Sequence, residues 1–156
     1  MQIEELIANK LLEKHLTIST AESCTGGLLS SLLTDVSGSS AFITYNVVTY
    51  ANAVKEKILG VPSEILDIFG AVSPECAKAM AIGLKRISNS DICLVTTGIA
   101  GPGGGSGDKP VGLCYVGVFI NGDVKTFKIN FPPETPRREM KLLFARNALL
   151  ILNEML

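Results

Sequence analysis

The chain has little histidine and no clustered cysteine, and both shortages exclude kinds of chemistry. His15 is the only histidine among 156 residues, so a Ser-His-Asp triad is excluded. Four scattered cysteines without a C-x-x-C pair exclude a zinc-finger framework: Cys24, Cys76, Cys93 and Cys114. The last three lie in apolar sequence and are expected to be small core residues. Cys24 lies in a polar turn, where its thiol could act as a nucleophile. We favour the alternative that Cys24 has a structural role.

Charge and long apolar runs are also scarce. The chain carries 14 Lys+Arg and 15 Asp+Glu, a formal net charge of −1, which gives no overall electrostatic footprint for nucleic acid or an anionic membrane. No apolar run approaches the roughly 20 residues that span a bilayer, and the acidic N-terminal stretch lacks a signal-peptide core. We therefore expect a cytoplasmic protein that binds neither nucleic acid nor membrane. A length of 156 residues suits one well-buried domain and is short for two, so residues 1–156 are expected to form one domain. Because 47% of the residues are hydrophobic, this domain is expected to be globular.

The apolar pattern predicts strands that alternate with helices. Helices are expected at 3–14, 26–35, 53–59, 63–70 and 74–87, with a last one from Thr135-Pro136 almost to Leu156; strands are expected at 16–20, 42–50, 92–97, 111–120 and 124–131. Asn121-Gly122 favours a two-residue type I′ hairpin between the last two strands. We predict an α/β fold: a single-domain three-layer α/β/α sandwich with a mixed, mostly parallel sheet and a C-terminal hairpin.

Finer patterns accompany these elements. Residues 16–20 alternate between apolar and polar, which suits a strand. Ser73 and Thr135, each followed by proline, are expected to cap the helices that they precede. The last helix is expected to carry its apolar stripe on Met140, Leu143, Phe144, Asn147, Leu150 and Ile151.

Two turns carry the polar residues around which we expect a site to form. The stretch TAESCTGG, residues 20–27, joins a strand to a helix and aims Ser23 outward beside free helix N–H groups. Such groups bind anions or stabilise an oxyanion. The stretch TTGIAGPGGGSGDKPVG, residues 96–112, follows another strand and has six glycines before Val111. Glycines at this density let the backbone approach a ligand closely.

Familiar catalytic and cofactor motifs are missing from these turns. The glycine loop matches neither G-x-G-x-x-G nor G-x-x-x-x-G-K-[ST] in register, so it lacks the residues of a Rossmann or P-loop site. The chain has no H-E-x-x-H motif and no G-x-S-x-G elbow. Hydrolysis by a serine would therefore need a base other than histidine, and we expect neither a metal nor a cofactor.

Lysine is the remaining base near a polar turn. Tyr50 and Lys55 follow a predicted strand and enter a helix, so both can face one cleft. A lysine that is desolvated there has a lowered pKa and can accept a serine proton. The plainer alternatives are a solvated Lys55, a Ser23 that only caps the next helix, and a Ser40 that is only a loop serine.

Arg137 and Arg138 lie in the first turn of the last predicted helix, where the helix dipole disfavours cations. An anion bound there by guanidinium and helix N–H groups together would explain the pair. Alternatively, both arginines point into water and pair with Glu134 or Glu139.

Four ordered motifs carry a resemblance to a known family. TAESCTGG, GSSAFITYNVVTYANAVKEKILGV, GAVSPE and TTGIAGPGGGSGDKPVG, which together extend over most of the chain, resemble the CinA C-terminal domain family. The family includes stand-alone nicotinamide-nucleotide amidases, and this chain is similar to that form. The resemblance implies hydrolysis of the carboxamide of nicotinamide mononucleotide, to nicotinate mononucleotide and ammonia, by a metal-free serine–lysine mechanism.

The resemblance also implies roles for residues of this chain. Ser23, Ser40, Tyr50 and Lys55 match the family's catalytic positions, with either serine as nucleophile or the two in a relay. Thr97 is expected at the ribose or carboxamide and Arg137 at the 5′-phosphate. Further substrate contacts are expected from Thr25, Gly26, Gly27, Gly98 and Gly101, with backbone N–H groups of residues 24–27 or of the glycine loop holding the oxyanion.

Two other functions stay open from sequence. A nucleotide-sensing or partner-binding module of the same fold would bind without turnover, and an amidase for a related nucleotide would share every motif. We also expect a homodimer, formed through the open edge of the 111–131 hairpin.

Overall fold

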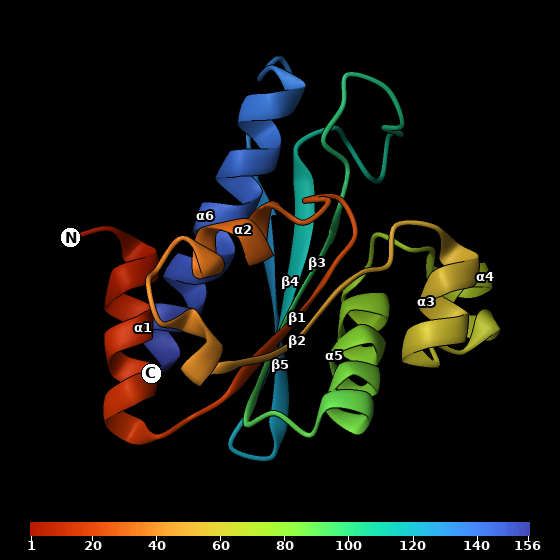
Figure 1. Ribbon diagram of the computed structural model, residues 1–156. Helices are drawn as coiled ribbons and strands as arrows, with labels where there is room; N and C mark the ends of the chain where they lie inside the picture. Colours follow the sequence, from red (N-terminus) through yellow and green to blue (C-terminus); the bar gives the residue numbers. More distant parts are fainter.

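A computed structural model describes residues 1–156, which form one α/β domain of three layers. The helices are α1 (Ile3–Lys14), α2 (Leu28–Thr34), α3 (Asn52–Leu59), α4 (Ser63–Phe69), α5 (Pro74–Ser88) and α6 (Arg137–Met155), with a 3₁₀ turn η1 (Ser39–Ala41); the strands are β1 (Ile18–Glu22), β2 (Ile43–Val48), β3 (Ile92–Gly98), β4 (Leu113–Ile120) and β5 (Asp123–Asn130). Helices α1, α2 and α6 cover one face of the sheet, and α3, α4 and α5 lie on the other (Figure 1).

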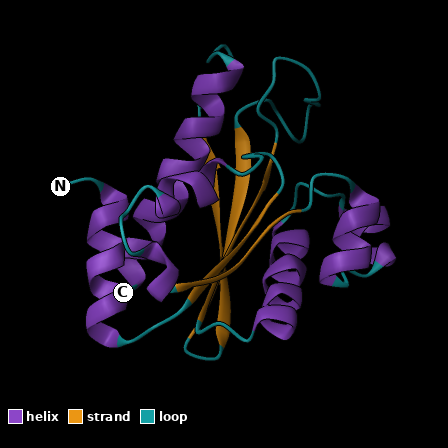
Figure 2. Cartoon of the chain, viewed as in Figure 1, coloured by secondary structure: helices purple, strands orange, loops and turns teal.

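The sheet is mixed, as predicted, and its strand order is β2-β1-β3-β4-β5. Its strands lie between two groups of helices (Figure 2). Strands β2, β1 and β3 are parallel, whereas β4 is antiparallel to both of its neighbours, so four of the five strands run in one direction. The parallel strands end together at Glu22, Val48 and Gly98. Ligands of open α/β sheets bind outside the carboxyl ends of such strands, and the two polar turns leave the sheet there.

The central strands are buried on both faces. Every residue of β1 is buried, and so is every residue of β3 except Gly98. The expected alternating strand at 16–20 is therefore wrong in position and in pattern, because β1 begins at Ile18 and helices cover both of its faces.

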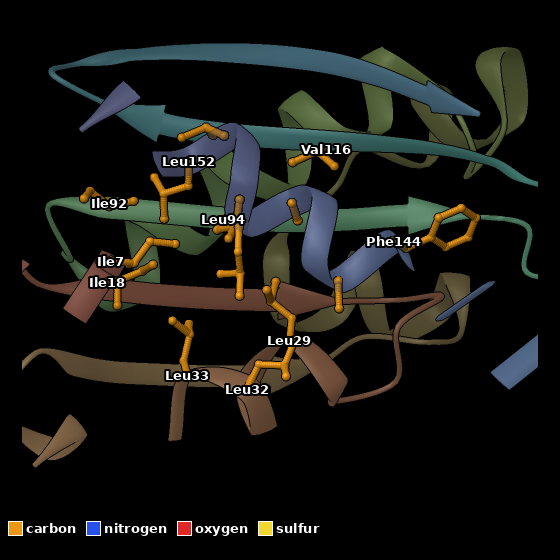
Figure 3. Packing of buried hydrophobic residues seen from close by; sticks show 14 of the residues in the cluster. Ile7, Ile18, Leu29, Leu32, Leu33, Ile92, Leu94, Val116, Phe144 and Leu152 are labelled. Atoms are coloured by element: carbon orange, nitrogen blue, oxygen red, sulfur yellow. The ribbon is translucent and has the colours of Figure 1, made fainter. Parts of the chain in front are cut away.

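The larger core lies between the sheet and helices α1, α2 and α6. Ile7, Leu29 and Phe144 of the helices and Ile18 and Leu94 of the sheet belong to one cluster of buried side chains (Figure 3). The predicted stripe of α6 is correct at Met140 and Phe144, but Leu149 and Leu152 are buried while Leu150 is half exposed. The helix wraps against both the sheet and α1, so the buried face lies to one side of the predicted one.

Local signals located most element ends. The Ser73 hydroxyl accepts a hydrogen bond from the N–H of Cys76, as a helix cap does. Asn121 and Gly122 have φ values of 53° and 79°, which suits the predicted type I′ turn. The predicted Thr135 cap is wrong, because its hydroxyl donates to the carbonyl of Pro132 and α6 begins at Arg137. No helix is both long enough and apolar enough to cross a membrane.

The second core brings α3 against α5, and Gly83 makes this close packing possible. A Cβ atom at Gly83 would lie 1.8 Å from the carbonyl oxygen of Leu59, at the end of α3. Helix α5 packs in turn on β1, β3, β4 and β5. The spacing between α3 and the sheet therefore depends on this absence of a side chain.

We predict that Gly83→Ala lowers the free energy of unfolding by about 1–3 kcal/mol, because the added methyl group has no space against the Leu59 backbone. Urea unfolding monitored by circular dichroism measures the change. Gly107→Ala is the matched control, since a Cβ atom there meets nothing within 4 Å. Equal stability of the Gly83→Ala variant and the wild type would contradict the packing described.

Candidate active site

A serine and a lysine lie in hydrogen-bond contact at the carboxyl end of the sheet. Lys55 Nζ is 3.0 Å from Ser23 Oγ and 3.0 Å from the carbonyl oxygen of Tyr50. Ser23 follows β1 directly, and Tyr50 lies between β2 and α3, the helix that carries Lys55. The ends of two neighbouring parallel strands thus bring Ser23 and Lys55 together, although 32 residues separate the two along the chain.

Lys55 is only 1% exposed, so the solvated-lysine alternative is wrong. Burial lowers the pKa of its ammonium group, against an opposing effect of the nearby Cys76 and Cys24 thiols. Its two hydrogen-bond partners are a hydroxyl and a carbonyl, and neither carries a charge that would hold the amine protonated. The environment therefore favours the neutral amine, which is the form that accepts a proton.

The pair lies in a cleft of about 260 Å³. Seven predicted site residues line it: Ser23, Tyr50, Lys55, Thr97, Gly98, Gly101 and Arg137. Thr97 closes one wall, because its buried hydroxyl donates to the carbonyl of Ala71 at 2.7 Å. The structure thus gathers residues from α3, β3, the glycine loop and α6 around the hydroxyl of Ser23, which directly follows β1.

Arg137 lies across the mouth of the cleft. Its guanidinium donates to the carbonyl of Gly101 at 2.7 Å and to the Tyr50 hydroxyl at 3.3 Å. The Tyr50 side chain therefore contacts Arg137, whereas the Tyr50 carbonyl contacts Lys55. The Tyr50 phenol thus meets the arginine and not the Lys55 amine.

Glu22 is a site feature that the sequence reasoning missed. Its fully buried carboxylate accepts from the Thr25 hydroxyl, the Leu29 N–H, and both the N–H and the hydroxyl of Ser30, at 2.6–3.0 Å. These N–H groups are the ones that the start of α2 leaves free. The sequence did contain a signal for this role, since Glu22 directly precedes a strand-to-helix turn. Acidic side chains are stabilised near helix N-termini.

This contact changes the expected roles of the turn residues. The start of α2 is occupied by Glu22, so its Leu29 and Ser30 N–H groups do not hold a substrate oxyanion. Thr25 is fully buried and holds Glu22 and Thr96 instead of lining the cleft. Gly26 and Gly27 are also outside the cleft, and their φ values of 61° and 106° shape the turn.

Ser40 lies away from the cleft of its own chain. It belongs to η1, which precedes β2, whereas Tyr50 follows β2 at the other end of the strand. Ser40 is exposed and does not line the cleft. A relay from Ser40 to Ser23 within one chain is thus contradicted, because the length of β2, about 20 Å, separates the two ends.

The cysteines are buried, as expected. Burial raises the pKa of the Cys76 and Cys93 thiols to about 11, and it raises the pKa of Cys114 well above its usual range. Cys24 Sγ lies 3.8 Å from Cys114 Sγ, with the Cys24 side chain at the cleft wall. Its proximity to Cys114 was not apparent from sequence, because 90 residues separate the two.

The other residues at the cleft were not singled out individually from the sequence, although they lie within its four motifs. They are Asn52, Ala71, Val72, Ile99, Ala100, Gly103 and Gly104. Asn52 is the one with a polar side chain, and it is exposed at the start of α3. No group of three histidine, cysteine, aspartate or glutamate side chains is close enough to hold a metal ion.

We predict that Glu22→Gln destabilises the chain by about 2–4 kcal/mol, because an amide nitrogen would face donors that now share a buried carboxylate. Urea unfolding at neutral pH measures the difference. Glu13→Gln in exposed α1 sequence is the control and should change stability by less than about 0.5 kcal/mol. A Glu22→Gln variant as stable as this control would argue against the network.

Comparisons with known proteins agree with the fold and identify the family. A competence/damage-inducible protein from Agrobacterium tumefaciens has a solved structure with a TM-score of 0.91 at 44% identity, covering 96% of this chain and 93% of that one. A CinA superfamily protein from Escherichia coli reaches a TM-score of 0.93 at 32% identity, covering 99% of this chain and 91% of that one.

A curated relative from Clostridium beijerinckii is named a putative competence-damage inducible protein. It is 50% identical over 131 residues, which is 84% of this chain and 32% of the relative. The chain thus spans about a third of the length of such relatives. A model of the CinA C-terminal domain matches residues 1–156, and the chain belongs to that family.

Proposed function

We propose that the protein hydrolyses the carboxamide of nicotinamide mononucleotide, releasing nicotinate mononucleotide and ammonia, with Ser23 as nucleophile and Lys55 as base. The 3.0 Å contact between Ser23 Oγ and a buried lysine without an anionic partner carries the proposal. Binding alone does not require a desolvated amine beside a hydroxyl, and burying one is costly. The substrate itself is inferred from the resemblance of the motifs.

The first chemical step uses the contact directly. Neutral Lys55 accepts the Ser23 hydroxyl proton while Ser23 Oγ attacks the carboxamide carbon. The resulting ammonium form of Lys55 then gives its proton to the departing ammonia, leaving a nicotinoyl ester on Ser23. Water attacks this ester with Lys55 again as base, which frees the acid and restores the serine.

Two N–H groups beside the cleft are available for the oxyanion. Cys24 directly follows the nucleophile, and Ala100 belongs to the glycine loop; neither N–H has a partner within the chain. Hydrolases of other folds pair the N–H after the nucleophile with one from a second loop. We assign the same task to these two groups, in place of the α2 N-terminus that Glu22 occupies.

The charges around the cleft suit an anionic substrate. Its lining includes Arg137 and Lys55 and no aspartate or glutamate. Once Lys55 is neutral, Arg137 is the remaining cation, and it lies at the mouth, where a 5′-phosphate attached to the buried pyridine ring would emerge. Guanidinium groups pair with phosphate through two parallel hydrogen bonds.

We predict ammonia release from nicotinamide mononucleotide by the purified protein. Ser23→Ala and Lys55→Met should each lower kcat by at least about 10²-fold, since one loses the nucleophile and the other the base. A coupled ammonia assay measures the rates. Lys57→Met, on an exposed position of the same helix, is the control and should retain wild-type activity. Full activity of Lys55→Met would refute the serine–lysine mechanism.

The pH dependence should follow the protonation of Lys55. Burial lowers the pKa of this group, so the active neutral amine forms at a lower pH than for an exposed lysine. We predict that kcat/KM rises with pH through a single step that lies below the ordinary lysine pKa. A profile that is flat, or that rises only at the ordinary lysine pKa, would contradict the assignment.

A further inference from the structure

Two free cysteine thiols lie in contact at the wall of the cleft. Cys24 Sγ is 3.8 Å from Cys114 Sγ, a distance at which either thiol can donate a weak hydrogen bond to the other. Cys24 belongs to the turn after β1, whereas Cys114 lies in β4 and pairs with Gly98 at the end of β3. The proposed hydrolysis uses neither sulfur atom, so the chemistry of this contact is separate from it.

The contact is close enough for a disulfide bond to form. A disulfide joins its sulfur atoms at about 2.05 Å, so the two Sγ atoms have to approach each other by about 1.8 Å. Cys24 and Cys114 are the two of the four cysteines whose sulfur atoms meet. Cys93 Sγ, by comparison, contacts the hydroxyl of Ser88.

The two thiols differ in their access to the cleft. Cys24 is 6% exposed and lines the cleft, whereas Cys114 is 0% exposed. Burial raises the pKa of Cys114 well above its usual range, so this thiol stays protonated. Lys55 lines the same cleft, close enough that a charge on Cys24 raises the pKa of its amine. The neutral amine is therefore a base beside Cys24, and the thiolate is the form of cysteine that reacts with oxidants.

We propose that Cys24 and Cys114 form a disulfide bond when a hydroperoxide enters the cleft, and that this bond reversibly stops turnover at Ser23. Lys55 takes the Cys24 proton, and the thiolate attacks the terminal oxygen of the peroxide. The O–O bond breaks, an S–O bond forms, and the leaving alkoxide or hydroxide takes the proton from Lys55. Cys24 is then a sulfenic acid, and the peroxide has become an alcohol or water.

Cys114 completes the reaction inside the core. Its sulfur attacks the Cys24 sulfur, an S–S bond forms and the S–O bond breaks. The Cys114 proton leaves with the hydroxyl group as water. The two thiols together lose two electrons and two protons, which the peroxide gains. A dithiol such as dithiothreitol reverses the oxidation by thiol–disulfide exchange.

The effect on turnover rests on the proposed function. Cys24 directly follows Ser23, and its N–H is one of the two groups that we assign to the oxyanion. A disulfide to the fully buried Cys114 draws Cys24 from the cleft wall toward β4. The Ser23 hydroxyl and the Cys24 N–H then lose their alignment, and a misplacement of about 1 Å costs about 10²-fold in rate.

The first test detects the disulfide and does not require amidase activity. The purified protein is treated with hydrogen peroxide, unfolded and alkylated, and its free thiols are counted by mass spectrometry. The four thiols of the wild type should fall to two, peptide mapping should join Cys24 to Cys114, and dithiothreitol should restore all four. A wild type that keeps four thiols, or that joins another pair, would overturn the proposal.

Matched variants identify the two partners. Cys93→Ala is the control and should still form the bond, because Cys93 contacts Ser88 and no other cysteine. Cys114→Ala should form no disulfide and should instead accumulate a sulfenic acid at Cys24, which dimedone traps. Dimedone labelling of Cys93 or Cys76 in place of Cys24 would contradict the assigned order of oxidation.

The second test compares ammonia release from nicotinamide mononucleotide with the disulfide content of the same samples. The rate of the oxidised wild type should fall by at least about 10-fold in step with the bond, and dithiothreitol should restore both. Full activity of chains that carry the bond would overturn its effect on turnover. A wild type that releases no ammonia even when reduced rejects the proposed amidase, whereas the mapped bond still supports the disulfide.

Discussion

The site depends on two hydrogen bonds of the buried Lys55 amine, one to the Ser23 hydroxyl and one to the carbonyl of Tyr50. An amine inside a protein costs several kcal/mol when it is charged. The chain meets this cost by supplying neutral acceptors and by lowering the lysine pKa. Strand β1, strand β2 and helix α3 must therefore keep their relative positions for the contact to exist, and Gly83 allows α5 to hold α3 close.

A buried carboxylate performs a different task at the same edge. The Glu22 carboxylate is balanced by four donors from the turn and from the start of α2. It therefore fixes the turn in which Ser23 directly follows it, and it excludes other anions from that helix end. Cys24 is the residue after Ser23, and its N–H has no hydrogen-bond partner within the protein. The strand-to-helix turn thus separates a structural anion from the place that a reacting oxygen would occupy.

Much of this arrangement was predictable from local signals. The helix start at Ser73-Pro74 and the turn at Asn121-Gly122 depend on backbone preferences of a few residues, and both are found. Lys55 and Arg137 were singled out from their places at the starts of helices, and both line the cleft. The predicted alternation of buried and exposed residues in β1 and the predicted apolar stripe of α6 were partly wrong. Burial depends on which neighbouring layers cover an element, and the spacing of apolar residues within the element does not reveal this.

Sequence by itself determined the order of elements, the two polar turns and the membership of the chain in the CinA C-terminal domain family. Only the tertiary structure decided that Ser23 meets Lys55, that Glu22 occupies the start of α2, and that Ser40 lies at the far end of its own strand. The reason is physical. Turns and helix ends depend on neighbouring residues, whereas contacts between side chains depend on how parallel strands and their helices pack in space.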